Sequence, residues 1–187
     1  MTAVLPSSGR PHGAQSAHGA PTSNPPPATR GAANIRSTLA AVNGIIDQTG
    51  TGRQKVVAAI DSVQSCTMTP ADGQAAIAEV VTERQRGMTQ LRRLDASAST
   101  APADRSVVQS LMAVIDDSVQ ADQDYAAWMG DVGSGQPSCR VPPMNDANFA
   151  AGQIFSAKAD SDKEVFVRAW NPLAGAAGLN TYNPQDF

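Results

Sequence analysis

The chain has 187 residues, a formal net charge of −3 and a sequence pI near 5.2. This length suits one domain, and the mildly acidic charge gives no reason to expect nucleic acid as a partner. Aromatic residues make up only 4% of the chain, which favours closely packed helices over a β-sandwich. No apolar run approaches the roughly 20 residues that a membrane-spanning helix needs, so no such segment is predicted.

Residues 1–33 predict a disordered tail or stalk. They contain six of the 13 prolines, and glycine, serine, alanine and threonine make up most of the remainder, so there is little apolar surface to bury. Both histidines, His12 and His18, fall in this stretch. The first six residues hold too little apolar sequence for a signal peptide, so a truncated ectodomain, a misplaced start and a cytoplasmic terminus all remain open.

The first predicted helix covers residues 34–65. Apolar residues recur at three- and four-residue spacing along it: Ile35, Leu39, Val42, Ile46, Val56, Val57, Ile60 and Val63. Gly50 and Gly52 interrupt this pattern, and two glycines cost about 2 kcal/mol in a helix interior. Because the spacing continues in phase across them, we expect one long helix with a kink rather than two short ones.

The second predicted helix covers residues 70–94, with Thr69 as its N-cap and Pro70 in its first turn. Its apolar positions are Ile77, Val80, Val81, Met88, Leu91 and Leu94. The same helix carries the densest basic cluster of the chain, which consists of Arg84, Arg86, Arg92 and Arg93. We interpret this cluster as a solvated helix face rather than a binding patch.

The third predicted helix, residues 102–132, is the longest and organises the rest of the fold. Its apolar stripe consists of Val107, Val108, Leu111, Val114, Ile115, Val119, Tyr125, Ala126 and Met129. The opposite face carries Gln109, Asp116, Asp117, Gln120 and Gln123. Gly130 and Gly133 are expected to end it. At 1.5 Å per residue the helix is roughly 45 Å long, so other helices must cover its apolar stripe.

The fourth predicted helix covers residues 146–170, with Asn145 or Asp146 as its cap. Its apolar set is Phe149, Ile154, Ala157, Val165, Phe166 and Trp170. We expect it to stop before Pro172, because a residue that precedes proline is disfavoured in the helical region. The last 15 residues are expected to be extended and packed across the other helices.

Four long helices with short connections predict an all-α, antiparallel up-down-up-down four-helix bundle. In this topology Cys66, after the first helix, and Cys139, between the third and fourth helices, lie at the same end. Neither cysteine belongs to a C-x-x-C motif or has a histidine nearby, so a zinc site has almost no support. A disulfide between them is the natural interpretation if the compartment is oxidising.

The sequence predicts no catalytic residues, no metal and no cofactor. A di-iron site in a bundle needs Glu-x-x-His pairs, and Ser-His or Cys-His catalysis needs histidine, but no histidine lies outside the tail. The carboxylates Asp116, Asp117, Asp122 and Asp124 are interpreted as a polar face, with one or two of them paired to Arg84, Arg168 or a neighbouring helix, rather than as an acid–base pair. Asp160 and Asp162 lack the other ligands of a calcium loop and are interpreted as surface residues.

One constellation remains as a candidate site, Asp122-x-x-Tyr125-x-x-Trp128 near the end of the third helix. These residues lie on neighbouring ridges of that helix. Since the third and fourth helices are antiparallel, Trp128 and Trp170 should lie toward opposite ends. We therefore favour core packing over a ligand pocket for all three residues, with Phe166 and Trp170 forming the aromatic core of the fourth helix.

The order D-x-x-Y-x-x-W, then a cysteine, then K-x-x-F-x-x-x-W-N-P-x-A resembles an uncharacterised helical domain of actinobacterial secreted and membrane-anchored proteins. Lys163, Phe166, Trp170, Asn171, Pro172 and Ala174 form the second part here, and the resemblance covers residues 34–187. It implies an extracytoplasmic location behind a signal or membrane segment, with a proline-rich spacer. It implies no activity and no catalytic residue, and the present chain lacks the export segment.

The sequence therefore favours a non-enzymatic extracytoplasmic bundle that binds a protein partner or senses at the cell envelope. The alternative is a small-molecule-binding or hydrolytic protein that uses the end of the bundle around Asp122, Tyr125 and Trp128. A third interpretation is a cytoplasmic bundle with free thiols. The ligand, the partner and the oligomeric state stay open.

Overall fold

The computed structural model describes residues 27–97, 101–135 and 145–186. Within these ranges the chain forms helices joined by turns and coil, and no strand occurs. The helices are α1 (Pro27–Thr49), α2 (Gly52–Gln64), α3 (Pro70–Asp95), α4 (Pro102–Gly135) and α5 (Ala147–Ala177). The all-α prediction is confirmed.

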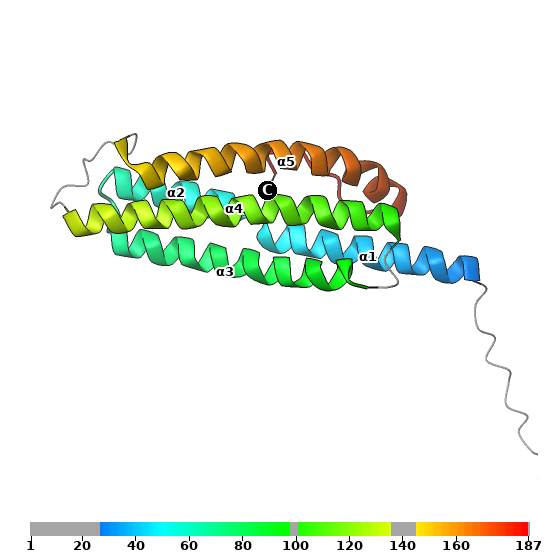
Figure 1. The fold of residues 1–187 in the computed structure, drawn as a ribbon. Helices are drawn as coiled ribbons and strands as arrows, with labels where there is room; N and C mark the ends of the chain where they lie inside the picture. Colours follow the sequence, from blue (N-terminus) through cyan, green and yellow to red (C-terminus); the bar gives the residue numbers. More distant parts are fainter. Residues whose placement is uncertain (1–26, 98–100, 136–144, 187) are drawn as a thin grey trace, which may run out of the picture.

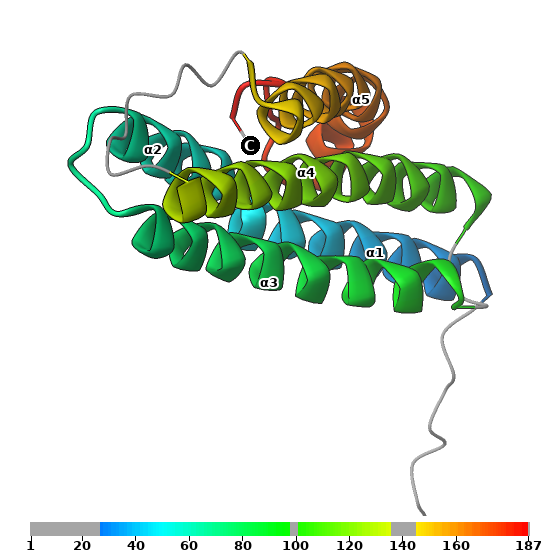
Figure 2. The same ribbon diagram turned by 60° about the vertical axis from the view of Figure 1, so that its left-hand side comes forward.

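The helices run side by side along one long axis (Figure 1). α1 and α2 follow one another in the same direction and together form the first rod, α3 returns, α4 runs forward and α5 returns. α4 packs most extensively against α5 and α3, and it lies between them in both views (Figures 1 and 2). The predicted antiparallel four-helix bundle is therefore confirmed, with its first rod divided in two.

The interior consists of two apolar clusters, one toward each end of the bundle. Trp170 and Phe166 belong to the cluster that includes α1, with their rings stacked at a centroid distance of 5.8 Å. Trp128 belongs to the cluster that includes α2, and its ring meets Phe149 edge-on at 5.0 Å. The two tryptophans thus occupy different clusters, as the antiparallel order of α4 and α5 requires.

The first rod departs from the prediction in two ways. α1 begins at Pro27 rather than at residue 34, because a proline fits the first turn of a helix and the alanine-rich stretch after it has high helix propensity. The rod is also divided by a turn at Gly50 and Thr51, so the expectation of one long helix is wrong. Thr51 keeps nearly helical dihedral angles (φ −81°, ψ −7°), which explains why the apolar spacing continues in phase across the turn.

The next two helices begin as predicted and end slightly later. The hydroxyl oxygen of Thr69 accepts a hydrogen bond from the backbone N–H of Asp72 at 3.1 Å, and Pro70 occupies the first turn of α3. α4 continues to Gly135, past the two glycines that were expected to end it. A glycine lowers helix propensity by about 1 kcal/mol, and packing between α3 and α4 outweighs that cost here.

α5 begins as predicted, since the Asp146 carboxylate accepts hydrogen bonds from the N–H groups of Asn148 and Phe149. It does not stop before Pro172 but continues to Ala177, so the predicted end at residue 170 is wrong. Trp170 and Ala174, on either side of the proline, are fully buried, and burial of this turn outweighs the lost backbone hydrogen bond.

The helix ends at Gly178, whose φ of 71° is a left-handed conformation that glycine adopts without strain. The chain then folds back over α5 and α1. The indole N–H of Trp170 donates to the carbonyl of Asn180 at 2.9 Å, and the Tyr182 hydroxyl donates to Asp47 on α1 at 2.8 Å. Leu179 and Tyr182 pack on the core, as predicted, while Phe187 lies outside the described residues.

None of the helices that the structure describes combines the length and the apolar character needed to cross a bilayer.

Candidate functional site: a charged cavity at the helix break

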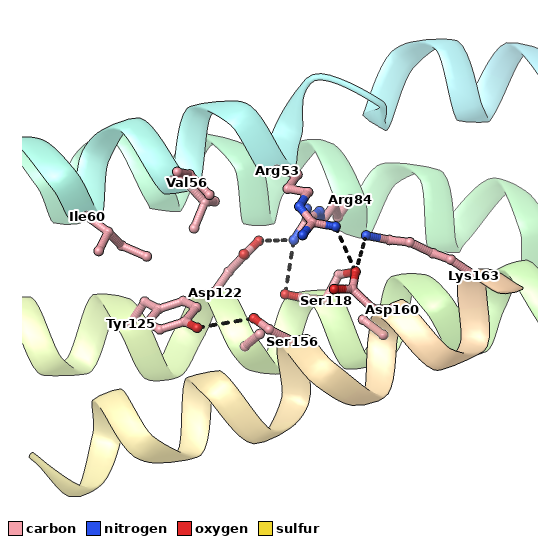
Figure 3. A pocket seen from close by; sticks show the side chains of 13 residues that line it. Arg53, Val56, Ile60, Arg84, Ser118, Asp122, Tyr125, Ser156, Asp160 and Lys163 are labelled. Carbon is pink, nitrogen blue, oxygen red and sulfur yellow. Dashed lines mark hydrogen bonds and ion pairs between the residues drawn. The ribbon is translucent and has the colours of Figure 1, made fainter. Parts of the chain in front are cut away.

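A cavity of about 200 Å³ lies in the middle of the bundle, next to the break between α1 and α2. Four helices, α2, α3, α4 and α5, contribute its walls (Figure 3). α2 packs mainly on α3 and makes little contact with α5, so the space between α2 and α5 stays open. The lining residues are Arg53, Val56, Val57, Ile60, Arg84, Ser118, Ala121, Asp122, Tyr125, Ser156, Ala159, Asp160 and Lys163.

Arg84 of α3 carries the most deeply buried guanidinium of the site, with only 9% of its side chain exposed. Its Nη1 donates to Asp122 Oδ2 of α4 at 2.5 Å and to the carbonyl oxygen of Ser118 at 3.0 Å. This ion pair joins the two central helices. A buried pair of this kind contributes to stability only while both partners are present, because either charge alone is costly in the interior.

Asp122 is the titratable group that the site perturbs most clearly. Burial raises the pKa of its carboxyl to about 6, because loss of water disfavours the charged form more than Arg84 and Lys163 favour it. The carboxyl therefore exchanges its proton close to neutral pH rather than near pH 4.

A second ion cluster lies on the α5 side of the cavity. The ammonium of Lys163 donates to Asp160 Oδ1 at 3.0 Å, and Arg53 of α2 donates to the same oxygen at 2.8 Å. Lys163 is 5% exposed, and burial lowers its pKa. Asp160 and Arg53 are each 38% exposed, so this cluster forms the rim through which the cavity meets solvent.

The break itself makes room for the buried guanidinium. A Cβ atom on Gly52 would stand 2.9 Å from Cγ1 of Val80 and 3.2 Å from Nη2 of Arg84. Only glycine allows the start of α2 to approach α3 this closely. Gly52, one of the two glycines that weaken the helix, therefore lies where the charged side chain enters the core.

The opposite half of the cavity is apolar. Val56 and Ile60 of α2 face Tyr125 of α4, whose hydroxyl hydrogen-bonds to the Ser156 hydroxyl of α5 at 3.2 Å (Figure 3). Burial raises the pKa of Tyr125, which keeps its hydroxyl neutral. The site thus has a cationic end near the break and an apolar end toward Tyr125.

The structure brings together two of the three residues of the predicted constellation. Asp122 and Tyr125 line the cavity, whereas Trp128 does not and is 1% exposed in the core. The indole N–H of Trp128 has no hydrogen-bond partner among the described residues. Phe166 and Trp170 lie in the other cluster, away from the cavity.

Two predicted surface positions are wrong. Asp117, placed on the polar face of the third helix, is 3% exposed and accepts a hydrogen bond from Lys158 at 2.6 Å. Arg84, placed on a solvated basic face, is buried at the site, where it pairs with a carboxylate of α4, a pairing that the sequence also suggested, while Arg86, Arg92 and Arg93 are exposed as expected. Both errors have one cause: a charged residue that lies in phase with an apolar stripe finds a partner on the facing helix.

The predicted site did not include Arg53, and Lys163 appeared only in the family motif, although a signal for both exists. Lys163 lies at helical spacing between Ala159 and Phe166, both buried, and Arg53 lies three residues before the buried Val56. A charged side chain inside an apolar stripe indicates a nearby partner of opposite charge. By this criterion the apolar stripes of α2, α3 and α5 each indicate one cation of the site, namely Arg53, Arg84 and Lys163.

Cys66 follows α2 in a left-handed conformation, with φ of 64°. The described part of the chain contains no free cysteine. Cys139 lies outside the described residues, so its predicted pairing with Cys66 stays a prediction. Among the described residues, no group of three or more histidine, cysteine, aspartate or glutamate side chains is placed to hold a metal ion.

No protein-family model, curated protein or solved structure matches this chain. The resemblance to actinobacterial helical domains stays a prediction.

Proposed function

We propose that this protein is a non-enzymatic helical bundle that binds a small molecule in the cavity between α2 and α5. The proposal corresponds to the small-molecule-binding half of the alternative hypothesis from the sequence. The ligand would lie beside Asp122 and Tyr125 but not beside Trp128. The observation that carries the proposal is the cavity of about 200 Å³, which lies at a helix break and is lined from four helices. Small-molecule sites in bundles are formed between facing helices, where side chains from several helices converge on one space.

Binding at this position offers a route to sensing. A ligand between α2 and α5 would add contacts to the Arg53–Asp160 ion pair that already joins these helices, and α2 is joined to α1 through a two-residue turn. Occupation would favour one position of α2, as a ligand does when it prefers one of two conformations.

A hydrolytic activity is the weaker candidate. The pKa of Asp122 suits proton transfer near neutral pH, but its carboxylate already accepts a hydrogen bond from Arg84. The nearby hydroxyls of Tyr125 and Ser156 form a hydrogen bond with one another. Binding without turnover is therefore the simpler function for this site.

The location and the partner are separate parts of the proposal. We place the protein outside the cytoplasm, facing a cell-envelope partner, with a Cys66–Cys139 disulfide. The end of α2, the end of α4 and the start of α5 lie at the same end of the bundle (Figure 1), which supports this pairing. A loop of this length would stabilise the fold by about 4 kcal/mol in the chain-entropy view.

The proposal is tested with benzamide, a small neutral probe, by saturation-transfer NMR. The test variant is Val57→Trp, because Val57 lines the cavity while 48% exposed, so a large side chain can close the mouth without disturbing the core. Val165→Trp on α5, at a position 49% exposed and outside the cavity, is the matched control. We expect saturation transfer in the wild type and the control and its loss in Val57→Trp; equal transfer in all three would contradict the proposal.

A further inference from the structure

We propose that the natural ligand is a small organic anion with an apolar body, bound with its acidic group at Lys163 and Arg53 and its apolar part at Ile60 and Tyr125. This inference deepens the proposed function and rests on it. It follows from the charge of the cavity, from the hydrogen-bonding groups that the protein leaves unused, and from the separation of charged and apolar walls.

The cavity carries more positive than negative charge. Its lining includes three cations, Arg53, Arg84 and Lys163, but only two carboxylates, Asp122 and Asp160. With all five ionised, one positive charge has no counterpart among the lining residues. In a partly dry site such a charge interacts strongly, because solvent screens it less than at the surface. A bound monoanion would neutralise it.

The ammonium group of Lys163 has more N–H donors than the described residues supply with acceptors. An ammonium carries three N–H groups, and within the described part of the chain Asp160 is the only hydrogen-bond acceptor of Lys163. Arg53 donates to the same Oδ1 atom, so one carboxylate oxygen serves two cations. Buried cations are normally matched by acceptors, and a ligand carboxylate would supply the acceptors that are missing here.

Arg84 has a different part in the site. Its Nη1 donates to both Asp122 and the Ser118 carbonyl, and a Cβ atom at residue 52 would stand 3.2 Å from Nη2. We therefore infer that Arg84 fixes the arrangement of charges in the cavity through its bond to Asp122. Lys163 and Arg53 make the direct contacts with the anion.

The apolar half selects the body of the ligand. Val56, Ile60 and the ring of Tyr125 form a wall beyond the charged groups, on the side away from the break (Figure 3). An inorganic anion would leave this wall unfilled, whereas an aromatic or short aliphatic acid would cover it and gain from apolar burial. A cationic ligand would meet like charge at the other end.

The test compares benzoate with benzamide, its neutral analogue of similar shape, by isothermal titration calorimetry on the full chain. We expect benzoate to bind about tenfold more tightly, because a charge-assisted hydrogen bond is roughly twice as strong as a neutral one. Lys163→Met should remove most of that preference, measured as the ratio of the two dissociation constants within the variant. Lys158→Met, which removes the same charge from an exposed position of α5 outside the cavity, should leave the preference intact.

Arg53→Gln provides a second variant at a 38% exposed position, should Lys163→Met fail to fold. It should also weaken benzoate relative to benzamide. Equal affinity of the wild type for the two probes, or an equal loss in Lys158→Met and Lys163→Met, would overturn the anion proposal while leaving a cavity that binds small molecules. If neither probe binds the wild type, the proposed function itself fails.

Discussion

Gly52 lies so close to Arg84 that a Cβ atom at residue 52 would stand 3.2 Å from the guanidinium Nη2. The break in the first rod and the buried cation on α3 are therefore one feature of the molecule. Glycine weakens the helix at this point and at the same time leaves the space that the guanidinium occupies.

Replacing Gly52 should therefore destabilise the fold, although alanine is the better helix former. In Gly52→Ala the new methyl would stand 2.9 Å from the buried Val80, and such overpacking costs about 1–3 kcal/mol. Gly44→Ala is the control, because nothing lies within 4 Å of a Cβ at that position of α1, and it should stabilise by up to about 1 kcal/mol. Urea unfolding measures both, and a Gly52→Ala variant as stable as Gly44→Ala would contradict the assignment.

Arg84 and Asp122 should be strongly coupled in a double-mutant cycle. Arg84→Met or Asp122→Leu alone leaves a buried charge without its partner, at a cost of about 3–5 kcal/mol, whereas the double variant removes both charges and should cost less than the sum. The exposed pair Lys55 and Glu83, at 3.1 Å, is the control and should couple by less than about 1 kcal/mol. Similar coupling energies for the two pairs would show that the central pair is not desolvated.

The fold was predictable from the sequence because the features that define it are local. Apolar spacing, Thr69 before Pro70 and the Asp146 cap mark the helices, and their order predicts the bundle. The turn at Gly50 was not predictable, because Thr51 keeps nearly helical dihedral angles and the helical spacing of the apolar residues continues across the turn. The continuation past Pro172 was missed because burial of Ala174 outweighs a local signal.

The site was only half predictable, for a related reason. Asp122 and Tyr125 form a recognisable motif within one helix, but the partner of Asp122 comes from another helix. A sequence does not show which charged side chains meet across an interface. Arg84 and Lys163 interrupt their apolar stripes, which predicts partners of opposite charge without naming them.

Asp122 should give stability a defined pH dependence. Its pKa in the folded protein, about 6, lies above the ordinary value of 3.8, so the folded state holds this proton more tightly than the unfolded state. Its contribution to stability is therefore complete below about pH 4, is lost as the pH rises through about 6, and changes by about 3 kcal/mol in all.

The measurement is urea unfolding of the wild type and of Asp122→Asn between pH 4 and pH 8. The unfolding free energy of the wild type relative to that of the variant should fall between pH 4 and 6 and stay level above pH 7. A difference that is constant, or that grows with pH, would show that Arg84 dominates and holds the pKa of Asp122 low.

Cys66 should be replaceable by glycine with a gain in stability when the thiols are reduced. It follows Ser65, the C-cap of α2, and Thr67 N–H donates to Ser62 O at 2.9 Å, in the same pattern that Leu179 N–H and Ala174 O form around Gly178 after α5. A residue other than glycine in this conformation costs roughly 1–2 kcal/mol, so Cys66→Gly should recover about 1 kcal/mol and Cys66→Ala should not.

Under oxidising conditions the order should reverse, because wild type would keep the proposed disulfide and Cys66→Gly could not form it. Intact mass after alkylation, with and without reductant, shows which state is present. Free labelling of both thiols in protein from its own host would contradict the disulfide and remove a main support for the extracytoplasmic location.

The most direct test of the central claim is to map benzoate onto the backbone by titrating the ¹⁵N-labelled protein and following its amide NMR signals. A ligand in the cavity should shift signals from all four lining helices, with the largest changes near Arg53, Ser118, Asp122 and Lys163. Signals of α1 near Ile35 and of the segment around Tyr182 should stay in place. Changes scattered over exposed basic residues such as Arg92 and Arg93, with none at the cavity, would contradict the account.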